Sequence, residues 1–153
     1  MKVRFELLWP SKNSNWQRAF KLSEAGILFK EYVSRISQMN PCDVKCVSGV
    51  DALLQNKSQC KTWLCERNPN ISVSSEELAK KLNQAMNSGI SELRIVIGGP
   101  NGISKDEKEE VKPDFLWSFG ALTLPHELAA VIASEQIYRA FSILKHLPYH
   151  CGH

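Results

Sequence analysis

Two loops of this sequence combine residue types that could hold a small molecule. The first, Gly98-Gly99-Pro100-Asn101-Gly102, places three glycines in five positions. It matches neither the G-x-G-x-x-G dinucleotide fingerprint nor a P-loop, because no Lys-Ser/Thr pair follows the last glycine at the required distance. Glycine at this density is typical of backbone that approaches another group closely or adopts positive φ. The pattern leaves two interpretations open, a plain tight turn and a loop that cradles a ligand.

The second loop, residues 118–126, reads SFGALTLPH. Its residues are small or apolar, and it contains no acidic residue and no Lys or Arg, which makes it unsuitable for a phosphate. Apolar walls with main-chain hydrogen-bonding groups suit an uncharged heterocycle such as adenine. We therefore expect this loop to contact a heterocyclic ligand.

The cysteines and histidines do not form a recognisable metal motif. Cys42 and Cys46 are four residues apart and Cys60 and Cys65 five apart, so neither pair has the C-x2-C spacing of a zinc knuckle. We expect no metal, and cysteines that act as small buried hydrophobic residues. An odd total of five cysteines, and the absence of a signal peptide or an apolar run of membrane-spanning length, favour a cytoplasmic protein with no membrane association.

Hydrophobic periodicity places the two loops after strands. Residues 93–97 (LRIVI) are almost wholly apolar, which is typical of a strand covered on both faces of a parallel sheet, and the glycine loop follows directly. Ile27, Leu28, Val33 and Ile36, with Tyr32, recur at helical spacing and predict one apolar face of a helix that ends before Asn40-Pro41. The other expected elements are strands at 3–9, 43–47, 61–65 and the start of 117–124, a helix or loop at 48–58, and helices at 74–88, 105–112 and 127–145.

Strands that alternate with helices predict an α/β fold with a mostly parallel sheet flanked by helices. In such sheets ligands bind beyond the carboxyl ends of the strands, which again selects residues 98–102 and 118–125. Ser74 and Glu77 form a capping-box pattern that should begin one of the helices.

Composition excludes several classes of protein. With 153 residues, 43% hydrophobic and 23% charged, the chain is expected to form one globular domain spanning residues 1–153. A net charge of +3 is too small to indicate nucleic-acid binding by itself. The excess of positive charge lies in residues 1–60, which carry nine Lys and Arg against five Asp and Glu, and it is either a phosphate-facing surface or a solvated one.

Four motifs, in this order and spacing, give the sequence a specific resemblance. IGGPNGIS, WSFGALTLPH, SEQIYRAFSILK and the terminal PYH are similar to the RlmH family of SPOUT-class methyltransferases. The likeness is dense from about residue 61 to residue 150. The N-terminal part of the sequence is less similar to the family, because Trp9-Pro10 and a longer stretch at residues 11–22 replace the family's short Gly-Lys turn.

The resemblance implies a fold and a cofactor that the residue patterns alone do not. It implies a SPOUT fold with a C-terminal deep trefoil knot, with the knotted, cofactor-binding part at about 61–153, and S-adenosyl-L-methionine as the cofactor. We add Gly98 to the cofactor contacts that the resemblance implies, because it lies in the same glycine turn as Gly99. The substitution Gly99→Val is expected to abolish cofactor binding with little loss of stability. The implied cofactor contacts, with Gly98 included, are Leu64, Gly98, Gly99, Gly120, Ala121, Leu122, Thr123, Leu124 and Pro125.

The implied reaction is methylation of N3 of a pseudouridine in large-subunit (23S) ribosomal RNA. The N3 proton must leave, and the candidates to handle it are His150 first, then Tyr149 and His126. Tyr149 could also stack on the base or pack against its neighbours, and His126 could bind the substrate or have a capping or structural role. Arg139 is a candidate for substrate binding or for a helix-surface ion pair. The family commonly has Arg or Lys directly after the Tyr-His pair, where this chain has Cys151, Gly152 and His153.

The expected partners are the ribosome or its RNA and a second copy of the chain, with the apolar helix at 127–145 as either the dimer interface or a central core helix. Two other functions remain open. One is a non-catalytic ribosome- or RNA-binding protein that keeps the SPOUT fold, and the other is a SPOUT methyltransferase with another RNA target such as tRNA.

Overall fold

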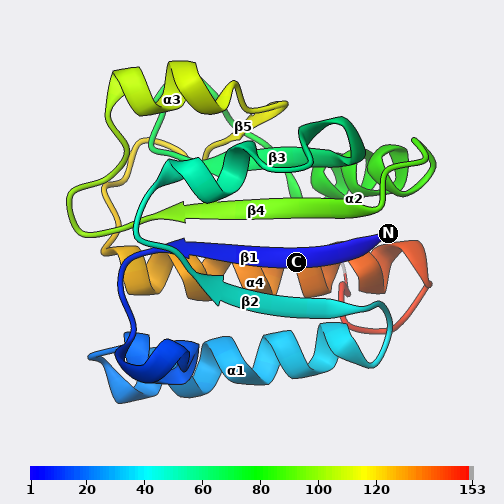
Figure 1. The fold of residues 1–153 in the computed structure, drawn as a ribbon. Coiled ribbons are helices and arrows are strands. Elements are labelled where there is room, and N and C mark those ends of the chain that lie inside the picture. The colour runs from blue at the N-terminus through cyan, green and yellow to red at the C-terminus, as the bar shows by residue number, and fades with distance from the viewer. Residues whose placement is uncertain (152–153) are drawn as a thin grey trace.

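The computed structural model describes residues 1–151, which form one parallel sheet with helices on both faces (Figure 1). The strands are β1 (Lys2–Leu8), β2 (Cys42–Cys46), β3 (Cys60–Cys65), β4 (Glu92–Gly98) and β5 (Phe115–Trp117), in the order β2-β1-β4-β3-β5. All four strand pairings are parallel. The predicted α/β class is confirmed, and each expected strand lies within a few residues of its predicted position.

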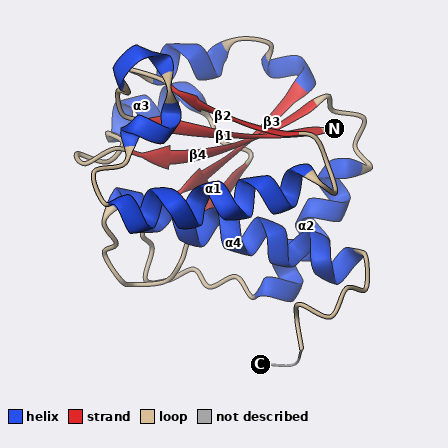
Figure 2. Ribbon diagram, turned by 90° about the horizontal axis from the view of Figure 1, so that it is seen from below, coloured by secondary structure: helices blue, strands red, loops and turns tan. Residues whose placement is uncertain are grey.

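Three helices cover one face of the sheet. They are α1 (Ser23–Ser37), α2 (Ser75–Met86) and α4 (His126–Leu144), and α4 packs between the other two (Figure 2). Alternate residues of β1, Val3, Phe5 and Leu7, are fully buried against this layer because side chains alternate between the faces of a strand. The layer therefore holds the main core and fixes where α4 begins relative to the ends of the strands.

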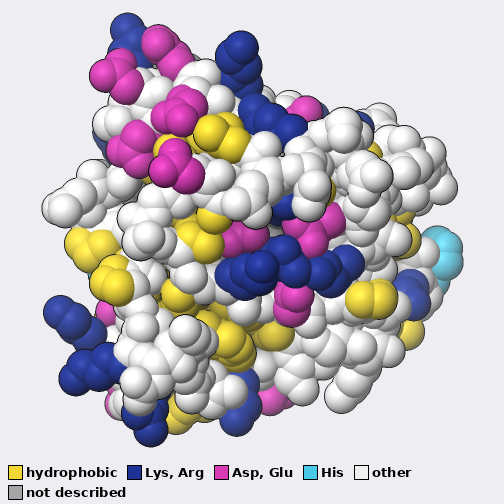
Figure 3. Space-filling model, in the orientation of Figure 1, with side chains coloured by type: hydrophobic (Ala, Val, Ile, Leu, Met, Phe, Trp, Pro, Cys, Tyr) yellow, Lys and Arg dark blue, Asp and Glu magenta, His cyan; other side chains and the backbone are white. Residues whose placement is uncertain are grey.

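The opposite face is covered only in part. The short helix α3 (Lys105–Val111) and a 3₁₀ turn at Val50–Leu54 bury a second, smaller core against Leu64 and Val96. Over β1 and β2 this face carries a band of ion pairs, seen across the middle of Figure 3, in which Arg4 contacts Asp43 at 2.8 Å and Glu92 at 3.2 Å. Glu6 on β1 shares this face and is 3% exposed.

Helix starts follow their capping residues. The Ser74 hydroxyl accepts the Glu77 amide at 3.1 Å and the Glu77 carboxylate accepts the Ser74 amide at 2.8 Å, so the predicted capping box is confirmed. Ser104 and Glu107 make the same pair of hydrogen bonds at the start of α3.

The predicted apolar face of α1 is partly wrong. Ile27 and Leu28 are 68% and 48% exposed, and the helix buries Ala25 and Phe29 together with Val33 and Ile36. Phe29 packs edge-on against Phe5 with ring centroids 5.5 Å apart, and this contact sets the rotation of the helix about its axis.

Between β1 and α1, residues 11–22 form two 3₁₀ turns, at Lys12–Ser14 and Trp16–Ala19. The Trp9 indole donates to the Ala19 carbonyl at 3.0 Å and is itself buried. The segment is therefore fixed to the body of the protein rather than looping away from it.

Candidate functional site

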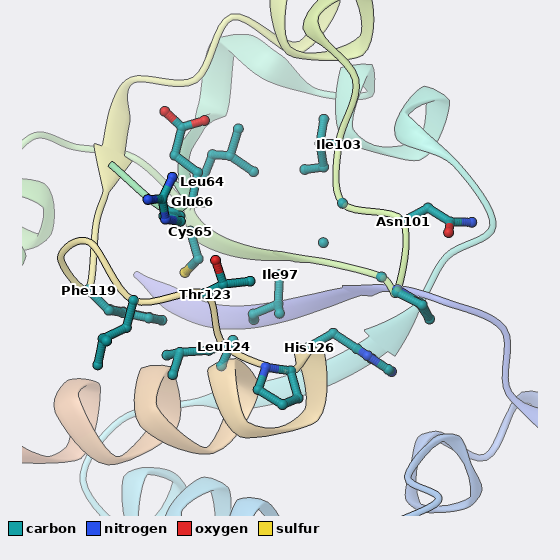
Figure 4. Close-up of a pocket in the computed structure, with 18 residues that line it drawn as sticks. Leu64, Cys65, Glu66, Ile97, Asn101, Ile103, Phe119, Thr123, Leu124 and His126 are labelled. Atoms are coloured by element: carbon teal, nitrogen blue, oxygen red, sulfur yellow. The ribbon is translucent and has the colours of Figure 1, made fainter. Parts of the chain in front are cut away.

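A cavity of about 730 Å³ lies at the carboxyl ends of β3 and β4, where a parallel sheet is expected to bind its ligand. Figure 4 shows the glycine turn and Ile103 on one side and Phe119, Thr123 and Leu124 on the other. Both loops selected from the sequence line this one cavity. Its lining consists of Leu64, Cys65, Glu66, Arg67, Ile97, Gly98, Gly99, Pro100, Asn101, Gly102, Ile103, Phe119, Leu122, Thr123, Leu124, Pro125, His126 and Ala129.

The glycine turn closes on itself by a hydrogen bond from the Gly102 amide to the Gly99 carbonyl at 2.9 Å. Gly102 has a φ of 68°, which explains a glycine at that position. Gly99 is required for a different reason. A Cβ there would lie 2.5 Å from the Leu8 carbonyl oxygen, at the end of β1. The expectation that Gly99→Val spares stability is therefore wrong, because the added side chain would collide with β1 inside the fold.

The second loop offers free main-chain groups to the cavity. Within residues 1–151, the amides and carbonyls of Leu122, Thr123 and Leu124 make no hydrogen bond to other protein groups. The loop is nevertheless held at its base, where the Ser118 hydroxyl donates to the Asn68 carbonyl at 2.9 Å and accepts the Gly120 amide at 3.0 Å. A fixed loop with unused amides and carbonyls can recognise the edge of an uncharged heterocycle.

Most of the predicted cofactor residues line the cavity, but two do not. Gly120 has a φ of 95° and forms the turn that directs the loop, and Ala121 uses its carbonyl to accept the Arg67 guanidinium. These two positions shape the loop rather than face the cavity. The predicted residues that do line it are Leu64, Gly98, Gly99, Leu122, Thr123, Leu124 and Pro125.

Charged lining residues were not predicted from the sequence. Glu66 and Arg67 directly follow β3, and the Glu66 carboxylate pairs with Lys108 of α3 at 3.0 Å. The rule that residues after parallel strands line the ligand site could have found both, because they occupy the same place after β3 as the glycine turn does after β4. The adjacent thiol is not ionised, since burial strongly raises the pKa of Cys65.

The groups that line the cavity fit S-adenosyl-L-methionine, the cofactor that the resemblance implies. The apolar walls and the free main chain of residues 122–124 match an adenine, and the Glu66 carboxylate can accept hydrogen bonds from ribose hydroxyls or lie near a positive charge. The cavity volume is also within the range of small-molecule sites.

His126 lies at the first turn of α4 and lines the cavity. Its ring meets the Trp9 ring edge to face with centroids 4.7 Å apart, and its Nε2 lies 3.8 Å from the Glu127 carboxylate. The structure therefore gives His126 both a packing role and a place at the cavity.

Tyr149 packs on the far part of α4. Its ring meets Tyr138 at 4.6 Å between centroids, the Arg139 guanidinium lies 4.8 Å above the ring, and its hydroxyl donates to the Glu135 carboxylate at 3.0 Å. Burial, together with hydrogen bonds to Tyr32 and Glu135, raises the pKa of the Tyr149 hydroxyl, which is therefore not a base in this conformation.

His150 is held between two helices. Its Nδ1 lies 3.2 Å from an Arg139 amino nitrogen and its Nε2 lies 2.9 Å from the Glu76 carboxylate of α2. Because arginine can only donate and an ionised carboxylate can only accept, a neutral His150 carries its proton on Nε2 and uses the Nδ1 lone pair for Arg139. The ring nitrogen that could accept a proton is thus occupied within this chain.

The tail and the cavity are not brought together in one chain. His126 and Arg139 are thirteen residues apart on α4, which corresponds to about 20 Å along the helix. Arg139 pairs with Glu135 at 2.7 Å, so the ion-pair alternative for this residue is confirmed. Residues Tyr149 and His150 lie with Arg139, away from the lining residues. His153, in the terminal segment that stands where the family has Arg or Lys, lies outside the described residues.

Curated relatives match part of this chain and are longer than it. The chain is 42% identical over 98 residues to Ribosomal RNA large subunit methyltransferase H of Psychrobacter sp. (strain PRwf-1), which covers 64% of this chain and 58% of that protein. It is 40% identical over 104 residues to the protein of the same name from Nitrosococcus oceani, covering 61% of this chain and 64% of the relative. The chain thus spans less than two thirds of the length of these relatives.

A solved structure shares the fold. The Ribosomal RNA small subunit methyltransferase E from Neisseria gonorrhoeae, bound to S-adenosyl methionine, aligns with a TM-score of 0.51 over 94% of this chain and 66% of that chain. Its identity of 12% limits the likeness to the fold. A family model described as "Predicted SPOUT methyltransferase" matches residues 20–150. Because that match includes both cavity loops, all of α4 and the tail as far as His150, this chain belongs to the SPOUT methyltransferase family.

Proposed function

We propose that this protein uses S-adenosyl-L-methionine to methylate N3 of a pseudouridine in large-subunit ribosomal RNA. The observation that carries the proposal is the mostly apolar cavity at the strand ends, in which residues 122–124 leave their main-chain groups free. The relatives that match this chain at 40–42% identity are named ribosomal RNA large subunit methyltransferase H, which supports the same substrate here.

The cofactor supplies a methyl group bonded to a positively charged sulfur, and the protein supplies position. An in-line displacement requires the acceptor nitrogen to be held close to the methyl carbon, on the side opposite the sulfur. Leu64, Ile97 and the 122–124 loop would hold the donor and exclude water, and the base would enter near His126, which also lines the cavity. The chain's main contribution to the rate is therefore orientation.

The active protein is proposed to be a homodimer. Within one chain, Tyr149 and His150 contact Glu135 and Arg139, which lie about 9 and 15 Å along α4 from Ala129, the last α4 residue that lines the cavity. A second copy is therefore the simplest source of these residues at the reacting base. Large exposed apolar side chains on α1, on the second loop and on α4 provide a surface that a second copy could cover. They are Ile27, Leu28, Leu122 and Leu128, which are 68%, 48%, 73% and 41% exposed.

The proton on N3 requires an acceptor. His150 remains the first candidate, and to act it must exchange its Nδ1 partner, Arg139, for the substrate proton. That exchange would also free one amino group of Arg139, the one that contacts His150, to face an RNA phosphate or the charge that develops on the base. His126, which already lines the cavity, is the second candidate.

Three experiments test this function. Calorimetric titration with S-adenosyl-L-methionine should give one site per chain, and ribosomal RNA from a deletion strain should lack one methyl group by mass spectrometry. Removal of residues 149–153 should abolish methyl transfer to ribosomes and leave the cofactor affinity within about twofold. Failure to bind the cofactor would contradict the proposal, and a methyl group missing from tRNA instead would redirect it to another RNA.

Three further expectations accompany the proposal. The C-terminal trefoil knot, the single domain over residues 1–153 and the cytoplasmic location stay predictions. No helix within residues 1–151 is long and apolar enough to cross a membrane.

A further inference from the structure

The segment of residues 11–22 carries positive charge that the rest of the protein does not neutralise. It contains Lys12, Arg18 and Lys21 and no acidic residue. All three side chains are exposed, and within residues 1–151 their charged groups make no ion pair or hydrogen bond. Arginines elsewhere, such as Arg4, Arg94 and Arg139, are paired with carboxylates.

The charge is concentrated on one part of the surface. Figure 3 shows basic side chains gathered at the lower left, over this segment and the start of α1, whereas acidic side chains gather at the upper left over α3. Like charges held near one another repel, and an external anion would relieve that repulsion. This region is therefore suited to a polyanion.

The segment is fixed to the wall of the cofactor cavity at both of its ends. Before the segment, Trp9 lies beside Gly99 of the glycine turn and packs edge-on against His126, at 4.7 Å between ring centroids. At its end, the Leu22 amide donates to the buried Glu127 carboxylate at 2.9 Å. His126 and Glu127 form the first turn of α4, and His126 lines the cavity.

The middle of the segment is also supported. The Trp9 indole donates to the Ala19 carbonyl, and Phe20 packs against Phe29 of α1 at 5.1 Å between centroids. The backbone that carries Arg18 and Lys21 is thus held in place, and only the side chains project into solvent. Cations on such a support can contact a ligand without the cost of ordering a loop.

We propose that residues 11–22 bind backbone phosphates of the RNA whose base enters the cavity, through Lys12, Arg18 and Lys21. The inference rests on the proposed function, because RNA is favoured over other polyanions by the attachment of the segment to the cavity wall. The segment would fix the register of the RNA and contribute no base specificity, as phosphate contacts generally do.

The test compares two triple variants of the full-length protein. Lys12→Gln, Arg18→Gln and Lys21→Gln together remove the proposed contacts. The control removes the same charge elsewhere, with Lys80→Gln in α2, Lys105→Gln at the start of α3 and Lys112→Gln directly after α3. All three lysine side chains are exposed. Binding to protein-free 23S ribosomal RNA is measured by filter retention between 50 and 200 mM KCl, and affinity for S-adenosyl-L-methionine by calorimetry.

Each phosphate contact contributes roughly 0.7 to 0.9 to the slope of log affinity against log salt concentration. The segment variant should therefore lose about 2 from the wild-type slope, which is about 100-fold in RNA affinity near 100 mM salt. Its cofactor affinity should be unchanged, and the control variant should keep the wild-type slope.

Three results would overturn the inference: no RNA binding by the wild-type protein, a slope unchanged in the segment variant, or an equal loss in the control. Failure of the proposed function is a separate outcome. It would appear as a wild-type protein that binds RNA with the expected salt slope but does not bind the cofactor or methylate ribosomes.

Discussion

The buried carboxyl group of Glu6 makes the stability of this protein depend on pH in a direction opposite to that of most carboxylates. Glu6 is 3% exposed, and one of its carboxylate oxygens has no hydrogen-bond partner among the described residues. Burial raises the pKa of Glu6 to about 7, although Arg4, Arg94 and Lys45 attract its charged form. Folding therefore takes up a proton near pH 6, which stabilises the protonated native state.

The size of the effect follows from the two pKa values. An unfolded glutamate titrates near 4.3 to 4.5, so between that value and 7 the native state binds more protons than the unfolded state. The contribution of Glu6 to the free energy of unfolding is then lost as the pH rises through this window. Between pH 5 and pH 8 the loss is about 2 to 3 kcal/mol.

A comparison of the wild-type protein with the Glu6→Gln variant isolates the contribution of Glu6 to the pH dependence of stability. The glutamine keeps the size of the side chain and cannot ionise, so the variant should be more stable than the wild type at pH 8 and near it at pH 5. Urea unfolding at pH 5, 6, 7 and 8 gives the free-energy difference between the two proteins, in which all other titrating groups cancel. A difference that stays constant from pH 5 to pH 8 would refute the reasoning, because it would mean that Glu6 titrates alike in both states.

The remaining predictions concern the cavity, the tail and the dimer. Gly99→Ala should cost roughly 1–3 kcal/mol in urea unfolding because its Cβ meets a backbone oxygen, whereas Gly49→Ala, with nothing within 4 Å, should be nearly neutral; equal costs would contradict this. His150→Ala should slow methyl transfer by about 10²–10⁴-fold with unchanged cofactor affinity, and His146→Asn serves as the control. Sedimentation at micromolar concentration should give twice the 17.3 kDa chain mass and fall toward the monomer in Ile27→Asp; a wild-type monomer would exclude the dimer.

The order of the elements could be predicted from the sequence because local patterns determine it. The apolar run at residues 93–97 is buried on both faces as β4, and the Ser74 and Glu77 pair begins α2 at the expected residue. The cavity loops were predicted for a general reason, since the carboxyl ends of parallel strands meet at one edge. These features depend on neighbouring residues or on topology, and neither requires knowledge of side-chain packing.

What the sequence did not predict depends on contacts between distant residues. The apolar spacing in α1 fits two faces, and the ring of Phe5 on β1 selects the face with Phe29 over the one with Ile27. The role of Gly99 depends on where β1 ends, at Leu8, 91 residues earlier in the chain. The sequence likewise did not indicate that Glu76 of α2 would hold His150, because that hydrogen bond joins residues 74 apart.

The contact between Gly99 and the Leu8 carbonyl bears on how members of this family are compared. A glycine is needed there for β1 and β4 to end side by side, whether or not a ligand is ever bound. A homologue that had lost its catalytic activity would still be selected to keep it, since any larger residue would damage the fold. An invariant glycine at this position in an alignment would therefore be a marker of descent and folding. The main chain at positions 122–124 makes no hydrogen bond to the rest of the described protein. Residues 122–124 are therefore where a homologue that had lost ligand binding would first accumulate substitutions.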